Sequence, residues 1–240
     1  MEWFKNWFNS PYYHILYKER DSYEAEYFID NLIKYLKIPE NSKIIDIACG
    51  KGRHSIYLEQ KKMKVTGIDL SEKSINHAKK FENDNLFFFK HDMRKEFKKD
   101  TYDAALNLFT SFGYFNTINE HQTSVNAMAL NLKKEGLLII DFMNVNKTID
   151  NLVSVEEKKI DDILFNITRS VKGNYIQKEI TFNHNNKNYN FSEKVMAFTL
   201  SDLSNFIVNA KLEIINIFGD YNLNPFCKYN SDRLILICKK

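Results

Sequence analysis

The sequence has few of the residues that indicate a disulfide-stabilised, zinc-binding or membrane-spanning protein. Its 240 residues include only three cysteines, Cys49, Cys227 and Cys238, which are far apart and form no C-x-x-C pair. A disulfide framework and a metal site are therefore not expected. No apolar run reaches the roughly 18 residues of a membrane span, and the N-terminus lacks the basic start and continuous apolar core of a signal peptide. We expect a soluble, cytoplasmic protein with no membrane partner.

An excess of charge of one sign is also lacking. The chain carries 34 basic and 31 acidic residues, a formal net charge of +3. A chain with this balance has no broad positive electrostatic potential to attract a polyanion, so a nucleic-acid partner is not expected, although a local basic patch stays possible. The chain is 44% hydrophobic, enough to bury the core of one large domain or of one domain with an insertion. We expect a monomer or a homodimer.

Short apolar segments alternate with amphipathic ones over residues 43–142 and again over residues 198–240. Alternation of this kind predicts βαβ units and a mostly parallel sheet. Ser71 is the expected N-cap of one helix, Gly136 suits the C-terminus of another, and a late helix is expected to be capped at Ser201. The predicted strands are KIIDIA, KVTGIDL, NLFFFKHD, YDAALNLF, LLIIDF, KLEIINIF and RLILICKK.

The alternating pattern is interrupted in the second half of the chain. Apolar residues there recur every second position and are broken by KGN and NHNNKN, which predicts an inserted antiparallel meander. The expected organisation is an N-terminal helical cap (1–40), a Rossmann-like domain (41–150 and 198–240) and an antiparallel β lid (151–197). The polar segment 219–233 either closes over a substrate or forms a plain surface loop.

Two of the seven glycines, Gly50 and Gly52, fall in the first strand-to-helix turn. In an open parallel sheet, ligands bind beyond the carboxyl ends of the strands, and glycine lets the backbone approach a ligand closely. Asp69, at the end of the second strand, can accept hydrogen bonds from two ribose hydroxyls. Together these features predict a nucleoside cofactor.

The residues around the turn favour one cofactor. A dinucleotide fingerprint has a third glycine, where this chain has Ser55. Asp46, just before the turn, would repel a pyrophosphate in a poorly solvated crevice. It suits the cationic amino-acid end of S-adenosyl-L-methionine, which carries an ammonium and a sulfonium.

The ordered motifs DIACGKGRH, GIDLS, HDMR, LNLFTSFGYF and GLLIIDF resemble those of class I S-adenosylmethionine-dependent methyltransferases. A looser similarity extends to small-molecule N-methyltransferases, including enzymes that dimethylate nucleotide-linked amino sugars. The resemblance implies a Rossmann-like, doubly wound α/β fold whose seven-stranded, mostly parallel sheet has an antiparallel last strand and carries a small β lid. The chain lacks the N-P-P-Y/F motif of base methylation, and it has DFMNVNK where the amino-sugar enzymes have a proline- and tryptophan-rich turn.

The resemblance also implies roles for individual residues. Asp46 would lie near the ammonium, Asp69 at the ribose and Asp92 at the adenine amino group, while Leu108 and Phe109 would lie near the sulfonium. The full set implied to bind the cofactor from these motifs is Asp46, Ala48, Cys49, Gly50, Gly52, Asp69, Leu70, Asp92, Met93, Leu108 and Phe109.

The N-terminal segment and the fourth motif supply the other candidates. Tyr13, Tyr17 and Arg20 would cap the cofactor or, alternatively, belong to an ordinary packed helix. In the amino-sugar enzymes a histidine or tyrosine follows S-x-G and faces the methyl group; here that residue is Tyr114. Methyl transfer is an in-line displacement that needs positioning above all, and a base helps only where the acceptor is protonated. The candidate bases are Tyr114, His14 and, further off, His91 or Asp141.

These features predict a methyltransferase that acts by in-line transfer on a small molecule with an amine or a hydroxyl acceptor. An RNA-modifying methyltransferase and an NAD-linked oxidoreductase are the alternatives.

Overall fold

The structure is a computed structural model that describes residues 3–18 and 22–240. Its centre is a seven-stranded sheet in the order β10-β11-β5-β4-β1-β2-β3, in which β11 runs antiparallel to both of its neighbours and the other pairs are parallel. The predicted doubly wound α/β fold is therefore confirmed. The strands are β1 Lys43–Ile47, β2 Lys64–Asp69, β3 Leu86–Lys90, β4 Tyr102–Asn107, β5 Leu132–Met143, β10 Glu213–Phe218 and β11 Arg233–Lys239.

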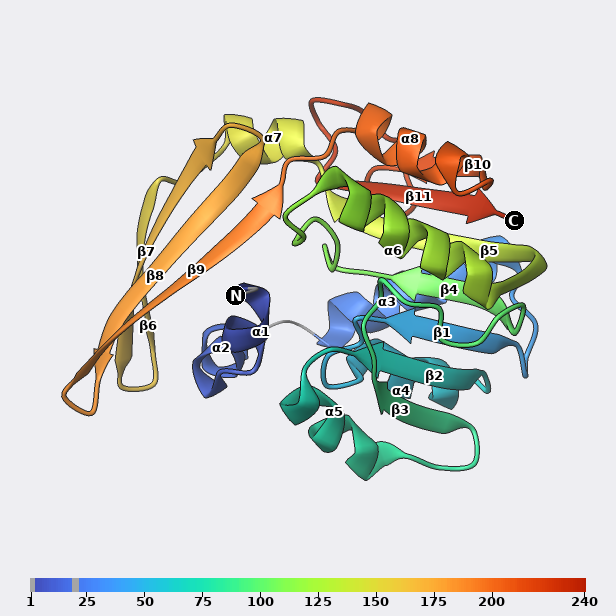
Figure 1. The fold of residues 1–240 in the computed structure, drawn as a ribbon, viewed down its shortest axis with the longest axis horizontal. Coiled ribbons are helices and arrows are strands. Elements are labelled where there is room, and N and C mark those ends of the chain that lie inside the picture. The colour runs from blue at the N-terminus through green and yellow to red at the C-terminus, as the bar shows by residue number, and fades with distance from the viewer. Residues whose placement is uncertain (1–2, 19–21) are drawn as a thin grey trace.

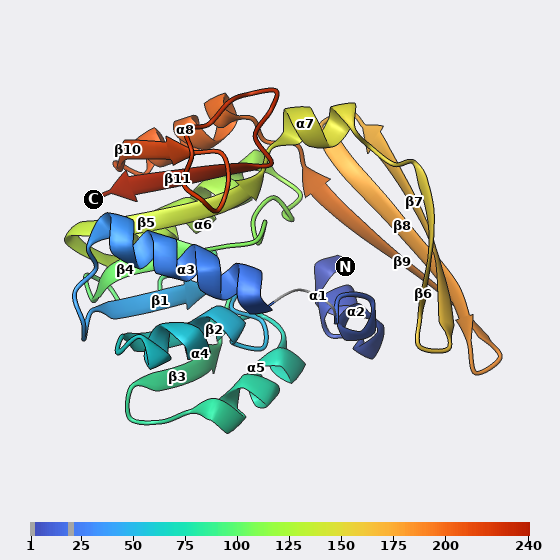
Figure 2. The ribbon, with the colours of Figure 1, turned by 180° about the vertical axis from the view of Figure 1, so that it is seen from behind.

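Helices cover both faces of this sheet, which is why its inner strands are apolar on both sides. On one face, α6 packs over β4 and β5 and α8 packs beside it over β10, and together they bury a cluster that includes Val125, Met128 and Ile207 (Figure 1). On the other face, α3 and α4 contribute Phe28 and Leu58 to a second cluster (Figure 2). The helices around the central sheet are α3 Ser22–Leu36, α4 Arg53–Gln60, α5 Glu72–Ala78, the 3-10 turn η1 Lys79–Phe81, α6 Ile118–Asn131, α7 Val145–Asp150 and α8 Leu200–Asn209.

Helix ends agree with the sequence in part. The Ser71 hydroxyl accepts the Ser74 N–H at 3.2 Å, so the predicted N-cap of α5 is confirmed. The prediction for α6 is wrong, because this helix ends at Asn131 rather than near Gly136. The predicted cap of α8 is also wrong: Thr199, not Ser201, caps this helix.

A second sheet is inserted between β5 and α8. It consists of β6 Val155–Ile160, β7 Ile163–Lys172, β8 Tyr175–His184 and β9 Lys187–Met196, which pair in sequence order and all antiparallel. We refer to these four strands as the lid sheet. Alternate residues such as Phe165 and Phe182 are buried on one face, as the two-residue periodicity predicts.

Two short N-terminal helices, α1 Trp3–Phe8 and α2 Pro11–Leu16, lie between the lid sheet and the central sheet (Figures 1 and 2). Trp7 and Leu16 are buried in a third apolar cluster with residues of the lid sheet. Helix α3, in contrast, packs on the central sheet. The segment 1–40, expected as one cap, thus contributes to two different cores.

Candidate active site

A cavity of about 440 Å³ lies at the carboxyl ends of β1, β2, β3 and β4 and is closed by residues of α1 and α2. Its volume is in the range typical of small-ligand sites. Gly52 does not line it, and Arg20 lies outside the described residues. Of the two more distant candidate bases, His91 lines the cavity and Asp141 does not. The sequence-predicted residues that line it are Tyr13, His14, Tyr17, Asp46, Ala48, Cys49, Gly50, Asp69, Leu70, His91, Asp92, Met93, Leu108, Phe109 and Tyr114.

The two glycines of the first turn serve different purposes. Both have positive φ, 58° at Gly50 and 86° at Gly52. A Cβ on Gly50 would meet no atom within 4 Å, so the backbone there borders open space. A Cβ on Gly52 would lie 2.6 Å from the Phe88 ring. Gly52 therefore allows α4 to begin close against β3, whereas Gly50 leaves the cavity open beside the turn.

Asp46 presents a buried carboxylate to the cavity. Its side chain is 2% exposed, and the Ser55 hydroxyl donates to Oδ2 at 2.6 Å. Burial raises the pKa of Asp46 to about 6; the Ser55 hydrogen bond opposes this rise and the charge of Asp69 adds to it. Ser55, which stands where a dinucleotide fingerprint has a third glycine, thus holds this carboxylate in place.

Asp69 is fixed at the end of β2 by backbone hydrogen bonds. Its Oδ2 accepts the Gly50 N–H at 2.9 Å and its Oδ1 accepts the Ser71 N–H at 2.7 Å. Burial raises the pKa of this carboxyl, and the N–H donors oppose the rise. A carboxylate oxygen can accept more than one hydrogen bond, so both oxygens retain capacity for a ligand.

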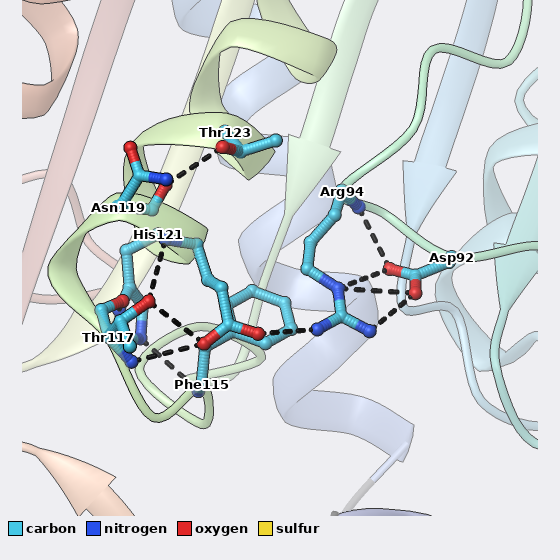
Figure 3. A network of polar contacts seen from close by, with 8 residues as sticks. Asp92, Arg94, Phe115, Thr117, Asn119, His121 and Thr123 are labelled. Carbon is cyan, nitrogen blue, oxygen red and sulfur yellow. Dashed lines mark hydrogen bonds and ion pairs between the residues drawn. The ribbon is translucent and has the colours of Figure 1, made fainter.

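Asp92 belongs to an ion-pair network that the sequence did not predict (Figure 3). The guanidinium of Arg94 donates to both of its oxygens, with Nη2 to Oδ2 at 2.7 Å, and Nη1 donates to Glu120 of α6 at 2.7 Å. The same guanidinium lies 4.8 Å from the ring centroid of Phe115. Burial alone would raise the pKa of Asp92, but Arg94 outweighs it and holds the pKa below its usual value. Asp92 is therefore held ionised at the cavity wall.

The candidate base Tyr114 lies in an aromatic wall. Its ring meets Trp3 and Phe8 edge-on, with centroids 5.7 and 5.3 Å apart. Its hydroxyl donates to the backbone carbonyl of Thr110. Because the phenolic proton is committed to that carbonyl, the oxygen of Tyr114 can face a ligand only as an acceptor.

The other candidate base, His14, is neutral at physiological pH. Burial lowers its pKa to about 4, and the positive charges of Lys51, His77 and Lys73 add to the effect. Its Nε2 is buried and has no hydrogen-bond partner among the described residues. The geometry thus leaves one polar imidazole atom available to a ligand.

Tyr17 connects the cavity to the lid sheet. Its hydroxyl donates to Glu193 Oε1 at 2.6 Å and accepts from Lys178 Nζ at 2.6 Å. The Trp7 indole N–H donates to the same Glu193 oxygen at 2.7 Å. The lid sheet supplies no cavity-lining residue in the described parts of the chain, but through these contacts it supports one.

Phe109 forms another part of the cavity wall. Its ring lies 4.7 Å from the guanidinium carbon of Arg53 and 5.2 Å from the ring of Tyr221, which it stacks on. Tyr221 comes from the 219–233 segment, so part of this segment packs behind the cavity wall. The sequence indicated no role for either partner: Arg53 lies in the DIACGKGRH motif but is not one of its implied cofactor-binding positions, and Tyr221 stands in no motif.

The site therefore combines the buried carboxylate of Asp46, the half-buried carboxylate of Asp69, a glycine turn and an aromatic wall at the carboxyl edge of a Rossmann-like sheet, where such folds bind their ligands. Residues 38–194, more than half of the chain, match the family model described as "Methyltransferase domain". The chain belongs to this methyltransferase family. The predicted resemblance is confirmed, and the oxidoreductase alternative is set aside.

Individual relatives agree with this assignment. A putative methyltransferase YqeM of Bacillus subtilis is 36% identical over 43% of this chain and 43% of its own length. A dTDP-3-amino-3,4,6-trideoxy-alpha-D-glucopyranose N,N-dimethyltransferase of Streptomyces venezuelae is 28% identical over 61% of this chain and 62% of its own length. The chain thus spans less than two thirds of either relative. An S-adenosylmethionine-dependent methyltransferase of Clostridium acetobutylicum has the same fold, with a TM-score of 0.80 over 95% of both chains at 17% identity.

The described residues contain no helix long and apolar enough to cross a membrane. Nor do they include a group of three or more His, Cys, Asp or Glu side chains arranged to hold a metal ion.

Proposed function

We propose that the chain transfers a methyl group from S-adenosyl-L-methionine to a small molecule, with an amine as the preferred acceptor. The observation that carries this proposal is the pairing of buried Asp46 with Asp69 in one aromatic-walled cavity at the carboxyl edge of the sheet. When bound, the cofactor supplies a methyl group on a good leaving group, two cationic centres and a ribose diol. The Asp46 carboxylate would attract the cationic centres, and the Asp69 carboxylate would accept hydrogen bonds from the ribose diol.

The other cavity residues complete the site in this proposal. The open backbone at Gly50 accommodates the methionine end, and Leu70, Asp92 and Met93 surround the adenine. Leu108 and Phe109 exclude water on the side of the transferring group. Because methyl transfer depends mainly on alignment, such an enclosed cavity is what the reaction requires.

An amine acceptor is supported by the aromatic wall. The rings of Phe8, Tyr13 and Tyr114 border the cavity, and aromatic faces attract ammonium groups. The unpartnered Nε2 of His14 can accept a hydrogen bond from an amine N–H when the other nitrogen carries the proton. With a pKa of about 4, His14 is a weak base, so we assign it to orienting a neutral amine rather than to deprotonating an ammonium. The Streptomyces relative, whose name describes an N,N-dimethyltransferase, supports the same acceptor.

We further infer that two parts of the chain have different roles at the cavity. The first consists of the central sheet with α3 to α6 and α8, and it binds the cofactor. The second consists of α1, α2 and the lid sheet, which share one apolar cluster; α1 and α2 line the cavity, and the lid sheet supports them from behind.

Binding tests the cofactor assignment first. S-adenosylhomocysteine should raise the melting temperature and bind in calorimetry, whereas NAD should do neither. Asp69→Asn should weaken this binding. Asp103→Asn is the matched control, since Asp103 also accepts a backbone N–H, that of Lys43 at 2.8 Å, but does not line the cavity. Stabilisation by NAD alone would contradict the cofactor assignment.

Methyl transfer tests the acceptor. The protein is incubated with methyl-labelled cofactor and matched pairs of sugars and nucleotide-linked sugars that differ only by an amino or a hydroxyl group. Label should enter the amino member of a pair. Transfer to the hydroxyl member alone would contradict the preference for amines, and transfer only to added RNA would contradict the small-molecule assignment.

A further inference from the structure

The turn that follows β4 has an unfavourable backbone conformation. Phe109 and Thr110 have φ values of 55° and 58°. Left-handed conformations are unfavourable for non-glycine residues and persist only where the surroundings enforce them. Thr110 is also β-branched, which makes this conformation an outlier for its type. The turn needs support from outside its own sequence.

That support comes from Asp141, near the end of β5. Its carboxylate is fully buried, and its Oδ2 accepts the Phe109 N–H at 2.8 Å. Its backbone carbonyl accepts the Thr110 N–H at 3.0 Å. One residue therefore binds both N–H groups of the unfavourable pair.

Two side chains from the end of the chain hold the carboxylate in turn. Arg233 Nε donates to Asp141 Oδ1 at 2.7 Å, and the Tyr221 hydroxyl donates to Oδ2 at 3.2 Å. Arg233 Nη2 also donates to the Thr110 hydroxyl at 3.0 Å. Tyr221 stacks directly on the Phe109 ring. Asp141, Arg233 and Tyr221 thus contact the turn from behind through both its backbone and its side chains.

The orientation of Phe109 matters because its ring is part of the cavity wall, whereas Asp141 does not line the cavity. We propose that Asp141, braced by Arg233 and Tyr221, is a positioning residue that fixes Phe109 in the conformation required for methyl transfer. The effect on rate rests on the function proposed above; the effect on the turn does not.

A stabilising role alone explains this arrangement poorly. A buried ion pair contributes little to stability compared with apolar residues of the same volume. Here the side chains contact the two residues of the turn whose backbone conformation is unfavourable. Arg233 and Tyr221, which hold the Asp141 carboxylate, lie 92 and 80 residues from it in the chain. This concentration on one turn is what a positioning role predicts.

Tyr221→Phe is the primary variant, because it removes the hydroxyl and keeps the ring stacked on Phe109. Asp141→Asn is less suitable, since it would leave the half-buried Arg233 guanidinium without its counter-charge and so endanger folding. Tyr27→Phe is the matched control. The Tyr27 hydroxyl donates to Asn222 of the same segment at 2.5 Å but does not contact Asp141.

The first readout is hydrogen exchange of the amides in residues 108–112, which requires no cofactor. Tyr221→Phe should raise the exchange rates of the Phe109 and Thr110 amides roughly tenfold, the factor for one lost hydrogen bond to a charged group. Tyr27→Phe should leave them unchanged. Equal rates in wild type and Tyr221→Phe, or an equal rise in both variants, would overturn the inference.

The second readout is the transfer reaction. Tyr221→Phe should lower kcat roughly tenfold while the acceptor KM and the affinity for S-adenosylhomocysteine stay within about twofold, because the lost interaction orients rather than binds. An unchanged kcat would overturn the positioning role. If the wild-type protein neither binds S-adenosylhomocysteine nor transfers a methyl group, the proposed function fails, and the exchange experiment still decides how the turn is held.

Discussion

Replacing Asp46 by asparagine should make the free protein more stable and the cofactor complex weaker. The carboxylate of Asp46 is buried, and its only hydrogen bond from a described side chain comes from Ser55 at 2.6 Å. Asparagine has almost the same shape, and its amide oxygen can accept that hydrogen bond. The substitution therefore removes a buried charge with little change in packing.

The pKa shift sets the size of the effect on stability. The pKa of Asp46 rises from 3.8 to about 6 in the folded protein. One pKa unit corresponds to about 1.4 kcal/mol, so the ionised carboxylate lowers the free energy of unfolding by about 3 kcal/mol. Below pH 3.8 the group is protonated in both states and this cost is absent. The cost develops as the pH rises from 3.8 to about 6 and is constant above that.

Asp46→Asn should therefore unfold at higher temperature than wild type at pH 8, by about 6 to 12 °C for a chain of this size. The difference should shrink towards pH 4. The affinity for S-adenosylhomocysteine should fall roughly 10- to 150-fold, the factor for a lost hydrogen bond between charged groups. Thermal unfolding between pH 4 and pH 8 and calorimetry at pH 8 measure the two effects.

Asp103→Asn provides the contrast, because Asp103 is paired with Lys133 at 2.6 Å and its pKa is lowered rather than raised. This variant should be slightly less stable than wild type and bind with unchanged affinity. The reasoning about Asp46 is refuted if Asp46→Asn is less stable than wild type at pH 8, or if the gap is the same at pH 5 and pH 8. Unchanged affinity would refute the assignment of Asp46 to the ammonium.

Three further variants test other parts of the site. Asp69→Asn should reduce the affinity for S-adenosylhomocysteine at least tenfold, which is roughly the effect of losing one hydrogen bond to a charged group. Unchanged binding in calorimetry would exclude a contact between Asp69 and the ribose. Gly52→Ala should lower the free energy of unfolding by about 2–4 kcal/mol, because the added Cβ would collide with the Phe88 ring and because alanine is strained at the positive φ of this position. A decrease below about 1 kcal/mol in denaturant unfolding would contradict this packing. Glu193→Gln should weaken the link between the N-terminal helices and the lid sheet and shift the fluorescence of Trp7, whose indole donates to it; an unchanged emission spectrum and melting temperature would count against that link.

The local parts of the site were predictable from the sequence. The strand KIIDI, with apolar residues on both faces, leads into a glycine turn and an amphipathic helix, and each of these patterns arises from residues adjacent in the chain. The carboxyl ends of parallel strands meet at one edge, so Asp46 and Asp69 could be placed together without a structure. Leu108 and Phe109 were placed beside them only by the resemblance to the methyltransferase motifs.

Two errors concern the ends of helices and have local causes. Glu135, not Gly136, has the positive φ of 66°. Gly136 is required for another reason: a Cβ there would lie 2.9 Å from the Lys133 carbonyl oxygen. At α8, the reciprocal hydrogen bonds of Thr199 and Asp202 form a capping box. The T-x-x-D spacing of residues 199–202 is visible in the sequence and indicates Thr199, rather than the neighbouring Ser201, as the cap.

The support behind the site could not be predicted, because it depends on strand order. The sequence indicates Asp141 only as a distant candidate base, and it indicates Arg233 and Tyr221 only as members of the polar 219–233 segment, with no individual role. Once β11 is known to lie antiparallel beside β5, with Ile235 opposite Asp141 and Arg233 opposite Met143, the ion pair follows. Arg233 and Asp141 are then diagonal neighbours on one face of the pair. Parallel strands all present their last residues at the cavity edge, but this antiparallel strand presents its first residue there. A single reversed strand thus brings a cation from near the end of the chain to the turn that shapes the cavity, and no pattern of adjacent residues encodes that approach.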